Sequence, residues 1–400
     1  MKRIDGVWHE ITSFANLCRA AIRAAAGKRA VRGVARFLDR LEPEALALQR
    51  ELRDGSYRPG QPVTFIVRDP KVREITAAPF RDRVVHHALI DVLEPHFDRS
   101  MVAHSFACRR GKGQHRALTW AQGLVRRHAW FLKLDVKGFF PSLSHDVVLD
   151  TLARRIADHD ALRLCETIVC AGGAEGRGLP IGHLTSQWFA NLVLDALDHW
   201  LVEQRRVPGY VRYMDDFVLF GGDKATLRGF YAEVDAWLAQ RGLALKPTAT
   251  LLAPVTQGLP FLGFRLYRGT RRLRPENLRR ARARLLRRRW QFGQGMLDEG
   301  SFADCTRSVL AWLAHGNTHA LRRTWFANED TAVDRLLLQS RQPRRQFQQH
   351  RHERAVGQPQ QQRTDDPQQQ PGLAPRQDVL SPDCGGRREV LFSAPMHSAP

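Results

Sequence analysis

The chain has 400 residues, 43% of them hydrophobic, which is enough for a large core and several subdomains. It has no apolar run of membrane-spanning length, no apolar stretch after Met1-Lys2-Arg3 and no C-x-x-C pair among six cysteines, so we expect a cytoplasmic protein without membrane partner, zinc site or disulfide framework. A net charge of +21 predicts a polyanionic partner, with nucleic acid preferred over an anionic membrane surface.

The first segment of the chain is predicted to be helical. Ala, Leu and Arg dominate residues 1–60, and Pro43 is expected to open a helix that stops at Gly55. Residues 63–77 (VTFIVRDPKVREITA) then read as two strands joined by a turn at Asp69-Pro70.

A helix is expected over 80–97, and it is followed by the basic loop CRRGKGQHRAL at 108–118 and a helix to about His128. Arg109, Arg110 and Lys112 surround glycines in this loop. They are candidates to hold nucleic-acid phosphate, with a basic surface turn as the equal alternative.

The middle of the chain alternates strands and helices irregularly. A strand is predicted to end at Asp135, and a loop from Gly178 feeds a long amphipathic helix. Residues 209–221 (GYVRYMDDFVLFG) read as two antiparallel strands, with another helix over roughly 224–241. This pattern favours the α+β class over a parallel doubly wound sheet.

Two adjacent carboxylates, Asp215 and Asp216, are expected at or beside the turn of this hairpin. Like charges raise each other's pKa, so the pair is costly unless a cation sits there. The plain alternative is a solvated polar turn, which is how we interpret Asp365-Asp366 in the Gln-rich segment. Asp135 ends another apolar strand, and adjacent central strands would bring all three acids to one edge, where Mg²⁺ is the fitting ion.

The C-terminal third is rich in arginine. Residues 259–267 look like a strand, and residues 271–289 are predicted to form a helix with one apolar and one cationic face. The apolar stripe is expected to comprise Leu278, Ala281, Leu285 and Leu286. The candidates for contact with a phosphate backbone are Arg279, Arg280 and Arg287. After about Ser340 the chain becomes Gln-, Pro- and Arg-rich, which predicts disorder.

The segments FLKLDVKGFFPSL, GLPIGHLTSQWFANL, YVRYMDDFVLF, LALKP and FLGF resemble, in order and approximate spacing, the palm motifs of reverse transcriptases. The resemblance covers about residues 60–330 and implies a right-hand polymerase fold with RNA-directed DNA polymerase activity. The implied divisions are a helical segment at 1–60, fingers and palm at 61–268, a basic helical thumb at 269–340 and a tail at 341–400.

The resemblance assigns the acids and one lysine to catalysis. Asp135, Asp215 and Asp216 would bind two Mg²⁺ ions, for which Mn²⁺ can substitute, with Asp216 the least direct ligand. Lys246 matches a lysine that protonates the departing pyrophosphate; taken alone it is a surface lysine.

Other matches concern the nucleotide and the primer. Lys71 and Arg73 would hold the triphosphate, unless they are merely part of an exposed hairpin. Phe140 matches the aromatic gate that excludes a ribose 2′-hydroxyl. The alternative is that it simply packs in the core beside Phe139. The remaining implied substrate and primer-grip residues are Gly182, Gln187, Tyr213, Leu262 and Gly263.

One departure points to a subclass. Where many reverse transcriptases carry Gln-Gly-x-x-x-Ser-Pro, this chain has Ile181-Gly182-His183-Leu184-Thr185-Ser186-Gln187. This form resembles the enzymes of diversity-generating retroelements, which copy a template RNA into cDNA from deoxynucleoside triphosphates with errors opposite adenine. Their usual partner is a small basic accessory variability protein.

Several alternatives stay open beside this interpretation. A group II intron-like enzyme would normally continue into a maturase segment, and a retron enzyme would carry a Val-Thr-Gly element. A defence-associated reverse transcriptase is not excluded by the sequence. Phe140 argues against an RNA-dependent RNA polymerase, and the intact acids argue against a catalytically silent RNA-binding relative.

Overall fold

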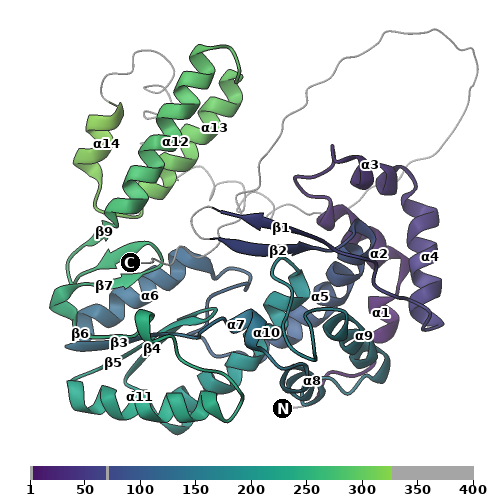
Figure 1. The fold of residues 1–400 in the computed structure, drawn as a ribbon, viewed down its shortest axis with the longest axis horizontal. Helices are drawn as coiled ribbons and strands as arrows, with labels where there is room; N and C mark the ends of the chain where they lie inside the picture. Colours follow the sequence, from purple (N-terminus) through teal and green to yellow (C-terminus); the bar gives the residue numbers. More distant parts are fainter. Residues whose placement is uncertain (1–2, 69–71, 327–400) are drawn as a thin grey trace, which may run out of the picture. The chain divides into compact units, whose positions relative to one another are not determined.

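The computed structural model describes residues 3–68 and 72–326, which divide into two units at Arg274–Pro275. The first unit contains the three β-sheets, and the second is helical within its described part (Figure 1). We expected a boundary at 268/269. It lies further along because residues 271–273 form the last strand of a sheet in the first unit rather than the start of a helix.

A four-stranded antiparallel sheet lies at the centre of the first unit, in the order β4-β5-β3-β6. Its strands are β3 (Trp130–Asp135), β4 (Gly209–Tyr213), β5 (Asp216–Gly221) and β6 (Leu251–Pro254). Strands β3 and β5 are apolar and buried along nearly their whole length. Helix α11 (Lys224–Ala239) packs against β3, β5 and β6 (Figure 1). The hairpin that carries the two acids is therefore part of a packed sheet.

Helices make up the rest of the first unit. They are α1 (Trp8–Ile11), α2 (Phe14–Ala24), α3 (Arg32–Asp39), α4 (Leu41–Arg53), α5 (Phe80–Ser100), α6 (Gly113–Arg127), α7 (Phe139–Ser142), α8 (His145–Ala153), α9 (His159–Cys170) and α10 (Leu184–His199). A π-helical turn at Trp200–Gln204 continues α10, and short 3₁₀ turns cover Pro247–Ala249 and Val255–Gln257. Helix α10 is buried on most sides and packs against α5 and α8, whereas α2 packs on α5. The N-terminal helices therefore share the core of the first unit.

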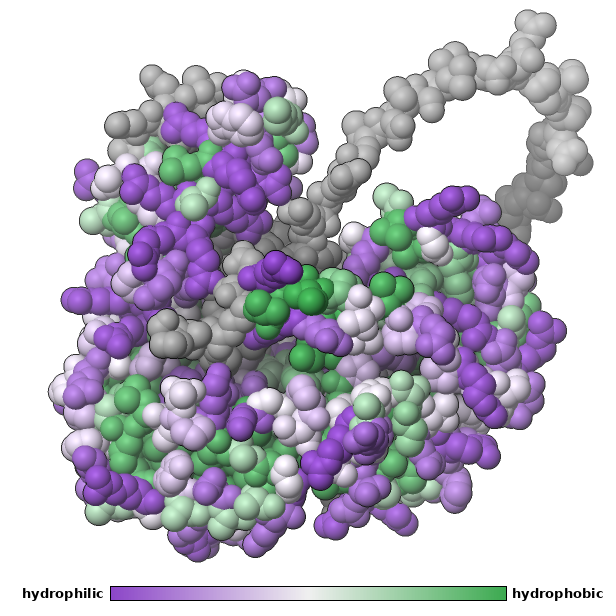
Figure 2. All heavy atoms as spheres, in the orientation of Figure 1, coloured by the Kyte–Doolittle hydropathy of each residue, from purple (hydrophilic) through white to green (hydrophobic). Residues whose placement is uncertain are grey.

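A two-stranded hairpin, β1 (Val63–Val67) with β2 (Arg73–Ala77), projects from these helices. All of β1 is exposed, and Figure 2 shows apolar residues gathered in this region. The predicted turn at Asp69-Pro70 lies outside the described residues. Strand β2 is tied to the loop before α10, because the Thr76 amide donates to the Ile181 carbonyl at 2.9 Å.

Residues 259–267 form a hairpin rather than the single strand we expected. Strands β7 (Leu259–Phe261), β8 (Phe264–Leu266) and β9 (Arg271–Leu273) make a three-stranded antiparallel sheet. The turn residues Leu262 and Gly263 both have positive φ, +46° and +83°, as a two-residue type I′ turn requires. Without an Asn-Gly or Asp-Gly pair the sequence carried only a weak signal for this turn.

The second unit contains α12 (Pro275–Gly293), α13 (Glu299–Leu313) and α14 (His319–Phe326). Of the predicted apolar stripe, Leu285 is buried whereas Leu286 is 55% exposed, so the stripe is narrower than expected. Arg279, Arg280 and Arg287 are exposed on α12. Hydrophilic residues cover much of the visible face of this unit (Figure 2). The predicted tail lies outside the described residues, and none of the described helices is both long and apolar enough to cross a bilayer.

Buried His86 predicts a pH-dependent stability. Its ring lies 5.1 Å from that of His183, and burial, followed by the charges of His183 and His87, lowers the pKa of His86 to about 3. Because the folded-state pKa lies below the ordinary 6.5, this stability contribution is present above pH 6.5 and is lost as pH falls below it. From pH 7.5 to 5.5 the loss is about 1.4 kcal/mol.

The measurement is urea unfolding at both pH values. His86→Gln should reduce the loss between pH 7.5 and 5.5 by roughly 1 kcal/mol relative to the wild type. His9→Gln, on the surface, is the control. An unchanged pH dependence in His86→Gln would contradict the assignment.

Gly182 predicts a second stability effect. Its φ is +119°, and a Cβ there would lie 2.9 Å from the Thr76 carbonyl oxygen and 3.1 Å from Ile75 Cγ2. Gly182→Ala should therefore destabilise the fold by about 1–3 kcal/mol in denaturant unfolding. Gly222→Ala is the matched control, since no atom lies within 4 Å of its Cβ position. Equal stability of the two variants would show that the loop has room for the methyl group.

Candidate active site

The two adjacent acids lie at the hairpin turn, as predicted. Tyr213 pairs with Asp216 across β4 and β5, so Met214 and Asp215 form a two-residue turn. Asp216 is also opposite Asp135 in the β3–β5 register. The amide of Val136 donates to the Asp215 carbonyl at 3.3 Å, which joins the turn to the end of β3.

Asp215 occupies an environment that opposes its negative charge. Burial and then the charge of Asp135 raise its pKa to about 7, with a smaller contribution from Asp216, whereas Arg73 acts in the opposite direction. The interaction with Asp135 means that the two carboxylates are close enough to repel each other. A cation between them would remove this cost.

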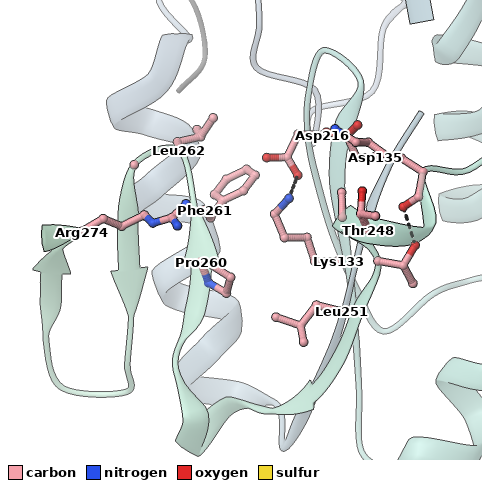
Figure 3. A pocket seen from close by; sticks show the side chains of 13 residues that line it. Lys133, Asp135, Asp216, Thr248, Leu251, Pro260, Phe261, Leu262 and Arg274 are labelled. Atoms are coloured by element: carbon pink, nitrogen blue, oxygen red, sulfur yellow. Dashed lines mark hydrogen bonds and ion pairs between the residues drawn. The ribbon is translucent and has the colours of Figure 1, made fainter. Parts of the chain in front are cut away.

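The third acid has a different partner. The carboxylate of Asp216 is fully buried and forms an ion pair with Lys133, Oδ1 to Nζ 2.9 Å (Figure 3). Burial raises the pKa of Asp216, and Lys133 opposes that shift. In the described part of the chain, no three acidic, histidine or cysteine side chains are grouped in metal-binding geometry. Asp216 thus lies opposite Asp135 and pairs with Lys133, whereas Asp215 interacts with Asp135 at the turn; the metal-binding roles of the three acids stay predictions.

Lys133 is the residue that sequence reasoning missed. It precedes Asp135 by two positions in β3, so both side chains lie on the same face of the sheet. Because Asp216 is directly opposite Asp135, its carboxylate lies on that face as well. An alternating lysine within an apolar strand was the signal that would have found it.

A cavity of about 230 Å³ lies beside these groups (Figure 3). Its charged lining residues are Lys133, Asp135, Asp216, Lys246 and Arg274. The backbone amide of Lys246 donates to the Asp135 carbonyl at 2.8 Å, which brings this predicted site residue to the acids. Leu262 and Gly263 line the other side of the cavity. The Gln114 side-chain amide donates a hydrogen bond to the Leu262 carbonyl oxygen, with a donor–acceptor distance of 2.9 Å.

The other predicted nucleotide contacts are distributed around the turn. Arg73 begins β2 and acts on Asp215 electrostatically, whereas Lys71 lies outside the described residues. Phe140, in α7, is partly buried and packs edge-to-face on Phe139 with ring centroids 5.8 Å apart. Gly182 touches the β1–β2 hairpin through Thr76.

Gln187 and Tyr213 both interact with Cys108. The Cys108 thiol donates to the Gln187 side-chain oxygen at 3.4 Å. Burial, and then the interaction with Cys108, raise the pKa of Tyr213. Cys108 itself has a φ of +57°, which is uncommon for a residue with a side chain.

The predicted phosphate-binding role of Arg109 is wrong. Its side chain is 4% exposed, pairs with Asp98 and donates to the carbonyls of Val102, Ser105 and Asp98. A guanidinium that is almost fully buried and bonded to these oxygens holds the loop together and is not exposed to a nucleic-acid phosphate.

The two neighbouring cations have surface contacts. Arg110 is exposed and pairs with Glu94 at 2.9 Å. Lys112 donates to the Ala103 carbonyl at 2.6 Å and lies 4.9 Å from the ring of Phe106. Their role toward nucleic acid stays a prediction.

The carboxylate pair fits a divalent cation. Asp135 and Asp215 present hard oxygen ligands on adjacent backbone segments, and their mutual repulsion is the feature that a bound cation relieves. A pair of protein carboxylates leaves most positions of an octahedral ion to water and phosphate, as is usual for Mg²⁺.

Comparison with known proteins shows several to which this chain is similar. Protein YkfC of Escherichia coli (strain K12) is 25% identical over 276 residues, which are 57% of this chain and 72% of YkfC. The putative COX1/OXI3 intron 1 protein of Saccharomyces cerevisiae is 27% identical over 165 residues, 38% of this chain but only 20% of that protein. The apo telomerase of Candida tropicalis, truncated from its C-terminal domain, aligns at 12% identity and a TM-score of 0.42 over 56% of this chain and 58% of the other.

Residues 68–266 match the family described as reverse transcriptase (RNA-dependent DNA polymerase). The matched range begins just after β1 and runs to the end of β8, so it includes Asp135, Asp215 and Lys246. The α+β arrangement with its antiparallel sheets is the right-hand polymerase fold. Residues 68–266 therefore form a reverse transcriptase family domain.

Proposed function

We propose that the protein is an RNA-directed DNA polymerase that uses Asp135 and Asp215 to hold Mg²⁺. The observation that supports this most directly is the repulsive pairing of these two carboxylates at the turn of a buried hairpin, within a reverse transcriptase family domain. When bound, Mg²⁺ supplies charge stabilisation for an in-line displacement on phosphorus and lowers the pKa of the attacking hydroxyl.

The residues around the pair would bind and orient the substrate. Arg73, with Lys71 beside it in sequence, would hold the triphosphate, where a guanidinium provides bidentate geometry. Lys246, tied to the Asp135 backbone, would donate a proton to the departing pyrophosphate. Asp216, expected as the least direct ligand, would act mainly by keeping Lys133 and the strand end fixed.

The primer and the template would be held from two sides. Leu262 and Gly263, at a tight turn lining the cavity, would support the primer end. The exposed arginines of α12, Arg279, Arg280 and Arg287, would contact the phosphate backbone. The partners in this proposal are template RNA, nascent cDNA and deoxynucleoside triphosphates.

Within this class we propose an error-prone enzyme of the diversity-generating type, acting with a small basic accessory protein. Ile181 and Gln187 support it, because an apolar side chain replaces an amide near the nascent pair and Gln187 is held by Cys108 beside Tyr213. Fewer polar contacts to the base pair would reduce the difference in transition-state binding between correct and wrong nucleotides.

An intron-type reverse transcriptase is the second candidate. The similarity to a yeast protein named for intron 1 of COX1/OXI3 favours it. The two candidates differ in accuracy and in the RNA that they engage, so the product sequence separates them.

The first experiment is primer extension on an adenine-containing RNA template with Mg²⁺ and each nucleotide set, with and without the accessory protein. Asp215→Asn should lower the extension rate by roughly 10³-fold or more, because a charged metal ligand is lost. Asp150→Asn, at an exposed ion pair on α8, is the matched control. Normal extension by Asp215→Asn would refute the metal role.

Sequencing the product of the same reaction tests the subclass. Errors concentrated opposite template adenine would support the diversity-generating type. An accurate DNA product would support the polymerase function and favour the intron-type candidate.

Phe140 predicts sugar selectivity. Phe140→Ala should increase the use of ribonucleotides relative to deoxynucleotides by about tenfold or more, because an aromatic ring no longer fills the space of the 2′-hydroxyl. The measurement is the ratio of kcat/KM for dGTP and GTP on the same primer and template. A wild type that already prefers GTP would overturn the assignment.

A further inference from the structure

Arg212 is a fully buried arginine in β4, three positions before Asp215. Its Nε and Nη2 donate to the two carboxylate oxygens of Asp198, at 2.7 and 2.5 Å, in a bidentate ion pair. Its Nη1 donates to the side-chain oxygen of Asn191 at 2.6 Å and to the carbonyl of Met214 at 3.1 Å. The guanidinium thus joins helix α10 to the turn that carries Asp215.

Met214, whose carbonyl accepts the bond from Arg212, has a strained backbone. Met214 has a φ of +56°, in the left-handed region where a side chain is unfavourable. Such a conformation persists only where surrounding contacts fix it. The Arg212 bond to the Met214 carbonyl and the Val136 bond to the Asp215 carbonyl hold the two turn residues from opposite ends.

Asp198 and Asn191, the side chains that hold Arg212, are themselves fixed by further hydrogen bonds. The Tyr210 hydroxyl donates to Asp198 at 2.6 Å, and the Asn191 side chain donates to the Ala107 carbonyl at 2.9 Å. Burial lowers the pKa of Arg212, but the carboxylate of Asp198 raises it above its ordinary value, so the guanidinium stays charged. A buried bidentate pair of this kind resists displacement, because breaking it leaves an uncompensated charge.

We propose that Arg212 is a positioning residue that fixes the Met214–Asp215 turn, so that the Asp215 carboxylate faces Asp135 in the geometry that binds metal. This inference rests on the proposed function, since it assigns a purpose to the placement of Asp215. Lysine at this position would keep the charge but could not make the forked contacts to Asp198 together with those to Asn191 and Met214.

The test compares Arg212→Lys with Arg155→Lys. Arg155 is 19% exposed and forms an ion pair with fully buried Asp195, one turn from Asp198 on α10. It also donates to Ser100, so it is a partly buried arginine pair on the same helix that does not touch the turn. Arg212→Lys should lower kcat about 10²-fold with a smaller change in KM, because a displaced ligand costs about this much. Its Mn²⁺ affinity, titrated by electron paramagnetic resonance on the protein alone, should fall about tenfold. Arg155→Lys should keep both values, even where its melting temperature falls equally.

Two results would overturn the proposal. One is an Arg212→Lys enzyme with wild-type kcat and Mn²⁺ affinity, and the other is equal losses in Arg155→Lys, which would indicate a general effect of weakening α10. If Arg212→Lys does not fold, Asn191→Ala removes one anchor of the guanidinium and should give a smaller loss of Mn²⁺ affinity in the same direction. An unchanged affinity in that variant would also count against the proposal.

The metal titration separates this inference from the proposed function. A wild-type protein without polymerase activity would refute the proposed function. The Mn²⁺ affinities of the three proteins would still decide whether Arg212 positions a metal ligand.

Discussion

The antiparallel pairing of β3 with β5 is the constraint on which the site depends. It sets Asp135 directly opposite Asp216, and it leaves Asp215 at the turn next to the end of β3. A shift of one residue in this register would send one of the facing acids to the opposite side of the sheet. The apolar, buried sequences of both strands fix the register, so the hydrophobic core and the acid geometry are specified by the same contacts.

Buried charge is costly, and this domain compensates each buried acid differently. Asp216 has Lys133, and Asp198 has Arg212, both within 3 Å. Asp215 instead interacts with the carboxylate of Asp135, which together with burial raises its pKa. Asp216 and Asp198 are neutralised by cations of the protein itself. The repulsion between Asp135 and Asp215 instead marks a pair whose counter-charge would be a bound cation.

The positions of the acids could be predicted from the sequence, because strand periodicity and a turn between apolar runs are local signals. Their partners could not. Arg109 looked like a phosphate ligand in a basic loop, yet tertiary packing brings Asp98 and three carbonyls around it. Lys133 looked like one polar residue in a strand, and its role follows only from the strand that β3 pairs with.

The sequence by itself determined the α+β class, the hairpin with its two acids and the cationic helix, since each follows from period, turn and composition within a short window. Tertiary structure alone decided which charges meet. It paired Asp216 with Lys133, turned residues 259–267 into a hairpin and buried Arg212 against the turn. The physical reason is that Coulomb and hydrogen-bond energies depend on distances between residues far apart in the chain, and only the folded backbone sets those distances.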